Sequence, residues 1–254
     1  MDSEMLSVQG LGKSYPKGGD AFWAVRDVSF ALARGRTLGL VGPSGCGKST
    51  LARCLAMVEP PTRGEIYLDG RRLESGGRGA IQLISQQPAA TLSPRFTADE
   101  IVCEPLLIQN RGGRAERRRA AFELMELVGL PPGASRRKAL EFSGGERQRL
   151  AIARGLALSP SLLILDESLS GLDLSIQAQI LNLLVDLQER RSLTCILISH
   201  DLGAVAQIAD EIAVMDAGAL VEHGPAADLL ARPRQARTRE LLRAPAMLAP
   251  GGAW

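Results

Sequence analysis

The chain has 254 residues, 45% of them apolar and 23% charged, with a net charge of +2. This is the composition of an ordinary globular protein with one large domain, and so small a net charge argues neither for nor against an acidic partner. No apolar run approaches the roughly 18 residues of a membrane span. The first ten residues lack the apolar core of a signal peptide, and four scattered cysteines argue against a disulfide framework or a metal site. We therefore expect a protein of the reducing cytosol.

In chain order, residues 1–40 predict short strands, and the last of these belongs to the apolar run RTLGLVG. The stretch GPSGCGKST (42–50) follows, and KSTLARCLAMV (48–58) then has helical spacing, with Leu55 and Val58 on one face. Glycines between a strand and a helix, ending in Lys-Ser, match G-x-x-x-x-G-K-[ST], a phosphate-binding loop. The alternative, a glycine-rich turn with a surface lysine, is disfavoured by the match in its strand–helix context.

The chemistry of such a loop assigns roles to its residues. Consecutive backbone N–H groups form an anion nest, and the helix N-terminus adds its positive dipole. Lys48 is placed to reach the β- and γ-phosphates of a nucleotide, and the Ser49 hydroxyl to bind Mg²⁺. Cys46 lies next to this helix N-terminus and to Lys48, which we expect to lower the pKa of its thiol. An inert spacer between two glycines is the alternative. The residues predicted here to bind ATP are Gly42, Pro43, Ser44, Gly45, Cys46, Gly47, Lys48, Ser49 and Thr50.

Strands and helices alternate through most of the remaining chain. AIQLISQQP (80–88) predicts a strand, and residues 97–158 have helical spacing. Strand signals return at 161–167 and 194–201, separated by the helical stretch 175–190. Alternation of this kind predicts a mainly parallel sheet covered by helices, and the long helical stretch predicts an inserted subdomain.

Two acids end the predicted strand LLILDE (162–167). Open α/β sheets bind ligands at the carboxyl ends of their strands, so Asp166 is placed to hold Mg²⁺ opposite Ser49. Glu167 is placed to orient or deprotonate an attacking water. Two acids that merely cap a strand–loop junction are the alternative, which the phosphate loop upstream disfavours.

A second glycine pair lies in FSGGERQR (142–149), with Ser143 at the N-cap position of a helix. Such a helix end binds anions for the same dipole reason as the phosphate loop. Taken by itself, the pattern is equally that of a helix cap.

Four motifs occur in order: the phosphate loop, SGGERQRLAIARGLALSPSLLILDE, SLSGLD and ILISHD. Together they resemble the ATP-binding subunit of an ABC transporter over roughly residues 5–230. The resemblance implies an α/β fold: a P-loop NTPase (RecA-like) core with an N-terminal antiparallel β-subdomain and an inserted α-helical subdomain. It implies an ATPase domain over 1–235, with the core at 1–87 and 161–235, the helical subdomain at 88–160 and a C-terminal tail at 236–254.

The resemblance also implies a site shared by two subunits that sandwich two ATP molecules. In the family, Ser143, Gly144 and Gly145 contact the γ-phosphate held by the other subunit's phosphate loop. Asp173, in SGLD, resembles the residue near the dimer seam. His200, which ends ILISH, resembles the histidine that hydrogen-bonds the γ-phosphate, although a structural histidine is the alternative on sequence alone.

Two further positions follow from the same resemblance. Gln86, in IQLISQ, resembles the glutamine that senses Mg²⁺ and the attacking water. Tyr15 matches the aromatic residue on which adenine stacks, with Trp23 as a weaker rival and edge packing as the alternative for both. The catalytic residues implied are thus Glu167, His200 and Gln86, and the Mg²⁺ ligands Ser49, Gln86 and Asp166.

Three positions depart from the family pattern. Glu146 replaces a glutamine after the signature glycines, Ser168 a proline after the catalytic glutamate, and Gly171 an alanine. None of these changes removes a group that touches phosphate or metal. Glu146 is expected to add negative charge near the γ-phosphate of the partner site, and hence to affect coupling or rate.

Residues 174–188 and the tail segment RTRELLRA (237–244) resemble the importer branch for dipeptides, oligopeptides and nickel. Gln-Ala-Arg (235–237) replaces the usual His-Pro-Tyr of that segment. The resemblance implies an ATPase, with ATP and Mg²⁺ as cofactors, that energises import. It is expected at the cytoplasmic face of the cell membrane as a peripheral protein.

The implied partners are a second ATP-binding subunit, identical or different, and two transmembrane permease subunits. A substrate-binding protein outside the membrane is an indirect partner, and no nucleic acid is expected. The permease should dock around residues 86–105. The basic run 111–120 is interpreted as a solvated helix face, with lipid headgroups as the alternative. The alternative function is an accessory ABC-type ATPase of a soluble complex, such as the phosphonate C–P lyase proteins.

Overall fold

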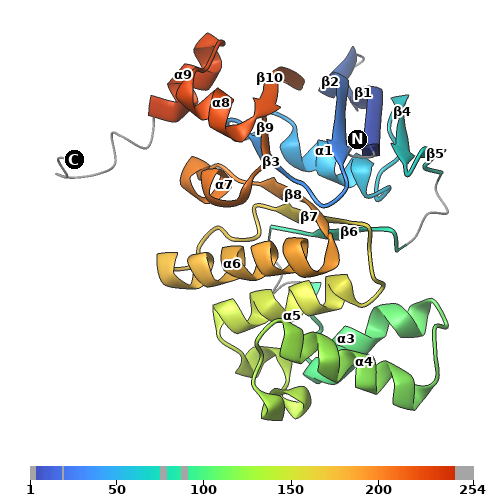
Figure 1. The fold of residues 1–254 in the computed structure, drawn as a ribbon. Coiled ribbons are helices and arrows are strands. Elements are labelled where there is room, and N and C mark those ends of the chain that lie inside the picture. Colours follow the sequence, from blue (N-terminus) through green and yellow to red (C-terminus); the bar gives the residue numbers. More distant parts are fainter. Residues whose placement is uncertain (1–3, 19, 75–78, 87–90, 244–254) are drawn as a thin grey trace, which may run out of the picture. The chain divides into compact units, whose positions relative to one another are not determined.

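The fold is described by a computed structural model over residues 4–18, 20–74, 79–86 and 91–243. The chain forms two compact units. The first is built from the described residues of 1–77 and 194–254, and the second from those of 78–193. Figure 1 shows that the first unit combines early (blue) and late (orange to red) parts of the sequence.

An antiparallel sheet forms one part of the first unit. Its strand order is β2-β1-β4-β5. Inward-facing apolar residues recur at every second position of β2, where Val28, Phe30 and Leu32 are buried. This alternation puts one face on the core and the other in solvent. The strands are β1 (Glu4–Lys17), β2 (Asp20–Ala33), β4 (Arg63–Leu68) and β5 (Arg71–Arg72).

A second group of strands in this unit has the order β10-β9-β3-β8. Strand β3 pairs in parallel with both β8 and β9, whereas β10 is antiparallel to β9. Every residue of β3 and β8 is buried, as expected for parallel strands covered on both faces. The strands are β3 (Thr37–Val41), β8 (Thr194–Ile198), β9 (Glu211–Asp216) and β10 (Ala219–Pro225). The helices are α1 (Lys48–Leu55), α7 (Leu202–Ile208), α8 (Ala226–Ala231) and α9 (Ala236–Arg243).

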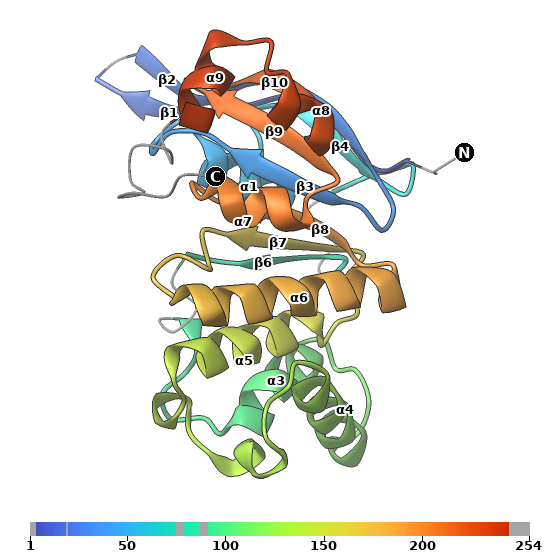
Figure 2. The same cartoon turned by 60° about the vertical axis from the view of Figure 1, so that its left-hand side comes forward.

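The second unit pairs two parallel strands with a set of helices. In register, β6 and β7 run from Ile81 opposite Leu162 to Ile84 opposite Leu165. Figure 2 shows α5 and α6 running alongside each other within this unit. The strands are β6 (Ile81–Ile84) and β7 (Leu162–Asp166). The helices are α3 (Ala98–Ile108), α4 (Arg114–Leu127), α5 (Gly144–Leu156) and α6 (Leu174–Arg191), with 3₁₀ turns η1 (Pro132–Arg136) and η2 (Ala139–Glu141).

The predicted α/β class is confirmed, with an antiparallel sheet, parallel strands and a helical segment. One detail is wrong: α1 ends at Leu55, and Val58 is 63% exposed instead of lying on the buried face. The boundaries predicted for the domain, the helical subdomain and the tail stay predictions. Compactness groups residues 161–193 with the helical segment, and α9 occupies the start of the predicted tail. Within the described residues, no helix is both long and apolar enough to cross a membrane.

Candidate functional site

The loop between β3 and α1 is shaped by steric limits that only glycine meets. A Cβ on Gly42 would lie 2.1 Å from the carbonyl oxygen of Met215, and one on Gly47 would lie 2.2 Å from that of Ala24. Both distances are far below any real contact, and both residues have positive φ, 157° and 110°. Gly45 faces no described atom within 4 Å, so its φ of 78° alone demands glycine. The bent backbone of the loop is therefore packed closely against the carbonyl groups of Met215 and Ala24.

Lys48, Ser49 and Thr50 follow the loop in the first turn of α1. The Lys48 side chain lies under the loop, where its ammonium donates to the carbonyl oxygens of Gly42 (2.9 Å) and Pro43 (3.0 Å). Lys48 is only 4% exposed, whereas Ser44 and Gly45 at the tip of the loop are exposed. A buried cation beneath a nest of backbone amides is an anion-binding arrangement.

Cys46 differs from its prediction. The thiol is 5% exposed, and its sulfur lies 4.0 Å from the Lys48 ammonium. Burial raises the pKa of the Cys46 thiol, and this effect outweighs the lowering by Lys48. The expectation of a lowered pKa was wrong because the helix N-terminus and the lysine were weighed without the cost of desolvation.

Tyr15 lies beside the helix that follows the loop. Its hydroxyl donates to Glu59, which also accepts a hydrogen bond from Arg53 in the last turn of α1 (Nε to Oε1, 2.6 Å). Burial and the Glu59 carboxylate raise the pKa of Tyr15. Trp23, its weaker rival, lies under the guanidinium of Arg63, 4.8 Å from the ring centre. Glu59 connects Tyr15 to α1, the helix that follows the phosphate loop, and this connection favours Tyr15 over Trp23 as the residue near a nucleotide.

His200 follows β8, which pairs in parallel with β3 up to Leu40 opposite Ile198. His200 is exposed, and the next residue, Asp201, caps α7 by accepting a hydrogen bond from the amide of Gly203 (2.8 Å). Because β3 leads directly into the phosphate loop, His200 and the loop both follow the carboxyl ends of neighbouring parallel strands.

In the second unit, β7 ends at the two predicted acids. Asp166 is 5% exposed, and Glu167 has a φ of 46°, the left-handed region that non-glycine residues rarely adopt. The side-chain amide of Gln86 donates to Glu167 (Nε2 to Oε2, 2.8 Å). Two residues predicted to be catalytic, 81 positions apart in the chain, are thus in direct contact.

The sequence reasoning missed a bond next to this acid. The Gln148 side-chain amide, in α5, donates to the hydroxyl of Ser168 at 3.2 Å. Gln148 is 2% exposed and Ser168 is 3% exposed. Ser168 stands where the family has proline, so the sequence showed the additional hydroxyl but not its partner Gln148.

The glycine pair at the start of α5 forms a capped helix N-terminus, as predicted. The Ser143 hydroxyl accepts from the amide of Glu146 at 3.3 Å, and the Glu146 carboxylate accepts from the amide of Ser143 at 2.8 Å. A Cβ on Gly145 would lie 2.5 Å from Ile176 of α6, whereas Gly144 has ordinary contacts. Gly145 therefore lets the start of α5 pack closely against α6.

The Glu146 carboxylate is held by the Ser143 amide at the start of α5 and by Arg137. Its carboxylate lies 3.2 Å from the Arg137 guanidinium. The backbone amide of Ser143 and, to a smaller extent, Arg137 lower the pKa of Glu146. The charge that Glu146 brings in place of glutamine is therefore partly compensated inside the same subunit.

Asp173 is exposed at the N-cap position of α6, where its carbonyl accepts from the amide of Gln177 (2.9 Å). Leu174, the next residue, is 80% exposed. Gly171 has a φ of 80°, which an alanine would adopt only under strain. The exposed residues Asp173 and Leu174 thus lie next to each other at the start of α6.

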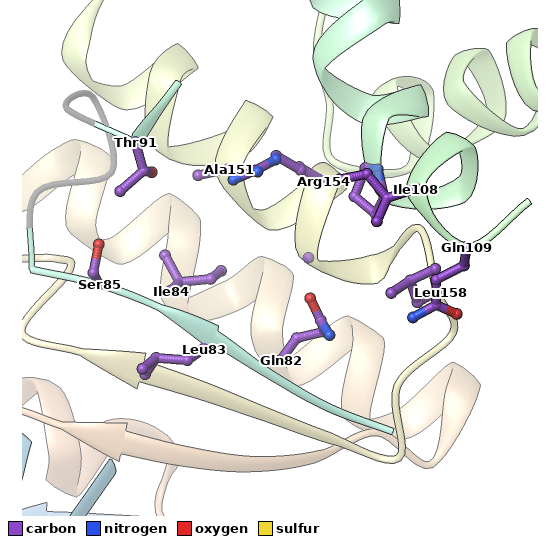
Figure 3. Close-up of a pocket in the computed structure, with 12 residues that line it drawn as sticks. Gln82, Leu83, Ile84, Ser85, Thr91, Ile108, Gln109, Ala151, Arg154 and Leu158 are labelled. Atoms are coloured by element: carbon purple, nitrogen blue, oxygen red, sulfur yellow. The ribbon is translucent and has the colours of Figure 1, made fainter. Parts of the chain in front are cut away.

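Two clefts in the second unit border α3. One of about 270 Å³ lies between β6, α3 and α5, and Figure 3 shows Ser85, Thr91, Ile108 and Arg154 around it. The other, of about 430 Å³, has apolar Phe96, Cys103 and Leu107 together with acids of α3 and arginines of α4 and η1. Phe96 and Leu107 are 40% and 57% exposed, and Ile108 is 71% exposed.

The predicted site residues therefore divide between the units. The first unit holds the phosphate loop with Lys48 and Ser49, Tyr15 and His200. The second unit holds Gln86, Asp166 and Glu167, together with the Ser143–Gly145 cap and Asp173.

Comparison with known proteins places these residues in a family. The family model described as ABC transporter matches residues 25–170. A putative peptide import ATP-binding protein of Brucella ovis is 45% identical over 96% of this chain and 79% of its own length. The dipeptide transport ATP-binding protein DppF of Escherichia coli is 43% identical over 98% of this chain and 79% of its own length.

Solved structures agree with the sequence relatives. An ATP-binding cassette solved as a dimer in a post-hydrolysis state with ADP and Pi has a TM-score of 0.79 and 29% identity, covering 87% of this chain and 99% of that one. CbiO1 of Clostridium perfringens, part of the transporter complex cbiONQ, has a TM-score of 0.80 at 24% identity, covering 97% of this chain and 96% of that one. At that identity the second likeness supports the fold alone.

Proposed function

The chain belongs to the ABC transporter family, and we propose that within it this protein is the ATP-hydrolysing subunit that energises a peptide importer. One observation carries the proposal: relatives named for peptide or dipeptide import are 43–45% identical to the chain over nearly its whole length. The chain is a nucleotide-binding ATPase coupled to transport, and the peptide cargo follows from these relatives.

ATP binding is assigned to the loop of residues 42–50. Its bent glycines direct backbone amides toward the phosphates, and Lys48 supplies a buried positive charge beneath them. Tyr15, fixed through Glu59 beside α1, is the surface on which adenine stacks. His200, exposed after β8, hydrogen-bonds the γ-phosphate.

Mg²⁺ fits the donor set that the chain offers. A hydroxyl at Ser49, a carboxylate at Asp166 and an amide oxygen at Gln86 are the hard oxygen ligands that this ion prefers. The ion supplies charge neutralisation on the β- and γ-phosphates when it is bound. Glu167, oriented by the hydrogen bond from Gln86, accepts the proton of the attacking water.

The complete site needs a second ATP-binding subunit. The Ser143 cap with Gly144 and Gly145 presents a helix N-terminus that suits the γ-phosphate held by the partner's loop. Exposed Leu174 beside Asp173 is then covered at the dimer seam. Two transmembrane permease subunits hold this pair at the cytoplasmic face of the cell membrane, a substrate-binding protein delivers the peptide from outside, and nucleic acid plays no part.

The permease docks on the second unit along α3. This helix borders both clefts and ends in exposed Leu107 and Ile108. The predicted docking range 86–105 covers most of α3 and stops just before these two residues. Residues 87–90 of that range lie outside the described residues. Arg117 of the basic run donates to the carbonyl oxygens of Arg111 and Gly112, just before the start of α4. These local bonds support the interpretation of the run as a solvated helix face.

Peptide import is favoured over the two alternatives, nickel import and an accessory ATPase of a soluble complex. The relatives reported above are named for peptides, which narrows the cargo from peptides or nickel to peptides. The same names favour a transporter over an accessory ATPase of a soluble complex. Whether the second ATP-binding subunit is identical to this one is settled by the same purification that tests the transporter.

The test is purification of the tagged chain from gently solubilised membranes of its host, followed by uptake of a radiolabelled dipeptide. We expect two multi-span membrane proteins to co-purify. Deletion of the gene should abolish uptake, with rescue by the wild type and not by Glu167→Gln. A purely soluble set of partners, with uptake unchanged by the deletion, would overturn the importer function.

The docking surface has its own matched variants. Ile108→Asp and Leu107→Asp should reduce permease co-purification without loss of ATP binding, because a carboxylate cannot enter an apolar contact without cost. Val58→Asp, at a site 63% exposed in the first unit, is the control and should retain the permease. Equal recovery of the permease with all three variants would show that α3 is not the docking surface.

A further inference from the structure

The C-terminal helix α9 is connected to the nucleotide loop through the turn between β9 and β10. At the loop side, the amide of Gly218 donates to the carbonyl oxygen of Cys46 at 2.9 Å. The carbonyl of Gly218 accepts from the amide of Arg26 at 2.7 Å. The carbonyl oxygen of Met215 lies only 2.1 Å from where a Cβ on Gly42 would be. Residues 215–218 thus form the rear support of the loop.

Helix α9 is anchored to the strand that leaves this turn. The carboxylate of Glu222 in β10 accepts from the amides of Arg234 (2.8 Å) and Gln235 (3.1 Å), the two residues before the helix. Burial alone would raise the pKa of Glu222, but hydrogen bonds to the carboxylate lower it. Thr238, on the inner side of α9, is 1% exposed. The helix therefore has a fixed place on the hairpin.

One side chain of α9 reaches the turn itself. Arg237 lies with Nε 3.4 Å from Oδ2 of Asp216, the last residue of β9. Its Nη1 donates to Glu240 at 2.7 Å, which fixes the guanidinium on the helix. Asp216 lies two residues before Gly218, whose amide holds the Cys46 carbonyl, and its negative charge acts on the Cys46 thiol.

An uncompensated carboxylate behind an anion-binding loop opposes phosphate binding, since like charges repel and the screening length at physiological salt is about 8 Å. We propose that α9 is a strap that supports the nucleotide loop, and that Arg237 is a positioning residue of this site that neutralises Asp216 behind it. The inference rests on the loop's proposed role in binding ATP. The proposal assigns α9, which begins the predicted C-terminal tail, a function in ATP binding.

The experiment measures ATP affinity and the steady-state KM and kcat of the purified chain. Arg237→Ala should weaken ATP binding and raise KM by roughly threefold, the scale of a partly exposed ion pair, with kcat unchanged. Arg237→Lys should restore most of the affinity, because it keeps the charge. Arg239→Ala, an exposed position on the same helix, is the matched control and should leave KM unchanged.

A charge-removal variant separates electrostatics from mere packing. In the double variant Arg237→Ala with Asp216→Asn, ATP affinity should return to near the wild-type value, and the Arg237→Ala defect should shrink at high salt. A defect that persists in the double variant, or an Arg237→Ala protein with normal KM, would overturn the proposal. Lys48→Ala tests the underlying assumption separately. ATP binding that survives this variant would refute the loop's role and the proposal with it, whereas loss of binding in Lys48→Ala beside a normal KM in Arg237→Ala would overturn the role of α9 alone.

Discussion

The phosphate loop of the first unit (residues 42–50) and the predicted catalytic segment of the second (residues 166–168) are held by different means. The loop owes its shape to the backbone, where Gly42 and Gly47 leave no room for a Cβ. The catalytic segment is held by side chains: Gln86 contacts Glu167, and Gln148 contacts Ser168. A backbone-limited site should fail when one methyl group is added, whereas a site held by side chains should lose function in steps.

The largest effect is expected at the reacting end of the catalytic segment. Glu167→Gln should lower kcat by roughly a thousandfold, because an amide cannot accept the proton of the attacking water. ATP affinity should stay near the wild-type value, since Glu167 lies outside the loop. Steady-state ATPase assays together with equilibrium titration of ATP check both statements. A kcat within a few fold of the wild type would remove Glu167 from the role of base.

The next largest effect is expected in the loop. Gly47→Ala should weaken ATP binding by roughly a hundredfold, because strained backbone of this kind costs of order 1–3 kcal/mol and the new Cβ meets the Ala24 carbonyl. Gly45→Ala, which faces strain without a clash, should lose less. Gly133→Ala, in η1, serves as the control. If all three bind ATP equally, the loop is not limited by its backbone.

The third largest effect is expected at the buried hydrogen bond from Gln148 to Ser168. Ser168→Ala removes the acceptor of the buried Gln148 amide and should lower the free energy of unfolding by about 1–3 kcal/mol. Ser175→Ala, at an exposed position of α6, is the control and should change it little. Urea unfolding of the two variants measures the difference. Equal stability of both would mean that water replaces the serine hydroxyl without cost.

The smallest effect concerns Glu146. Its pKa in the folded protein lies below the ordinary value of 4.5, because the Ser143 amide and Arg137 favour the carboxylate. The ionised carboxylate of Glu146 therefore stabilises the folded protein above about pH 4.5. This stabilisation is lost as the pH falls through the lower pKa that Glu146 has in the folded protein. Glu146→Gln should cost about 0.5 kcal/mol at pH 7, as for a partly exposed pair. The difference should shrink as the pH falls below 4.5, and a constant difference across that range would contradict this origin.

Much of the site was predictable from sequence because its chemistry is local. The motif GPSGCGKST places glycines, lysine and serine between a strand and a helix, and the structure has β3, the loop and α1 in that order. The Ser143 cap likewise depends on residues three positions apart. The α/β class followed from the alternation of apolar runs.

Other features required the tertiary structure. The pKa of Cys46 is raised because surrounding residues bury it, and neither its sequence neighbours nor its helix end reveals that cost. The exposure of Val58 follows from the end of α1 at Leu55, although the apolar spacing continues beyond it.

By itself, the sequence determined the backbone chemistry of the nucleotide loop, the capped signature helix and the family, because these depend on residues close together in the chain. Only the tertiary structure decided which distant side chains meet. Gln86 with Glu167, Gln148 with Ser168, and Arg237 with Asp216 are separated by 20 or more positions, and no local pattern specifies such pairs. The first two contacts arise because parallel strands and packed helices bring remote segments together. The third arises because α9 is anchored on the antiparallel β9–β10 hairpin.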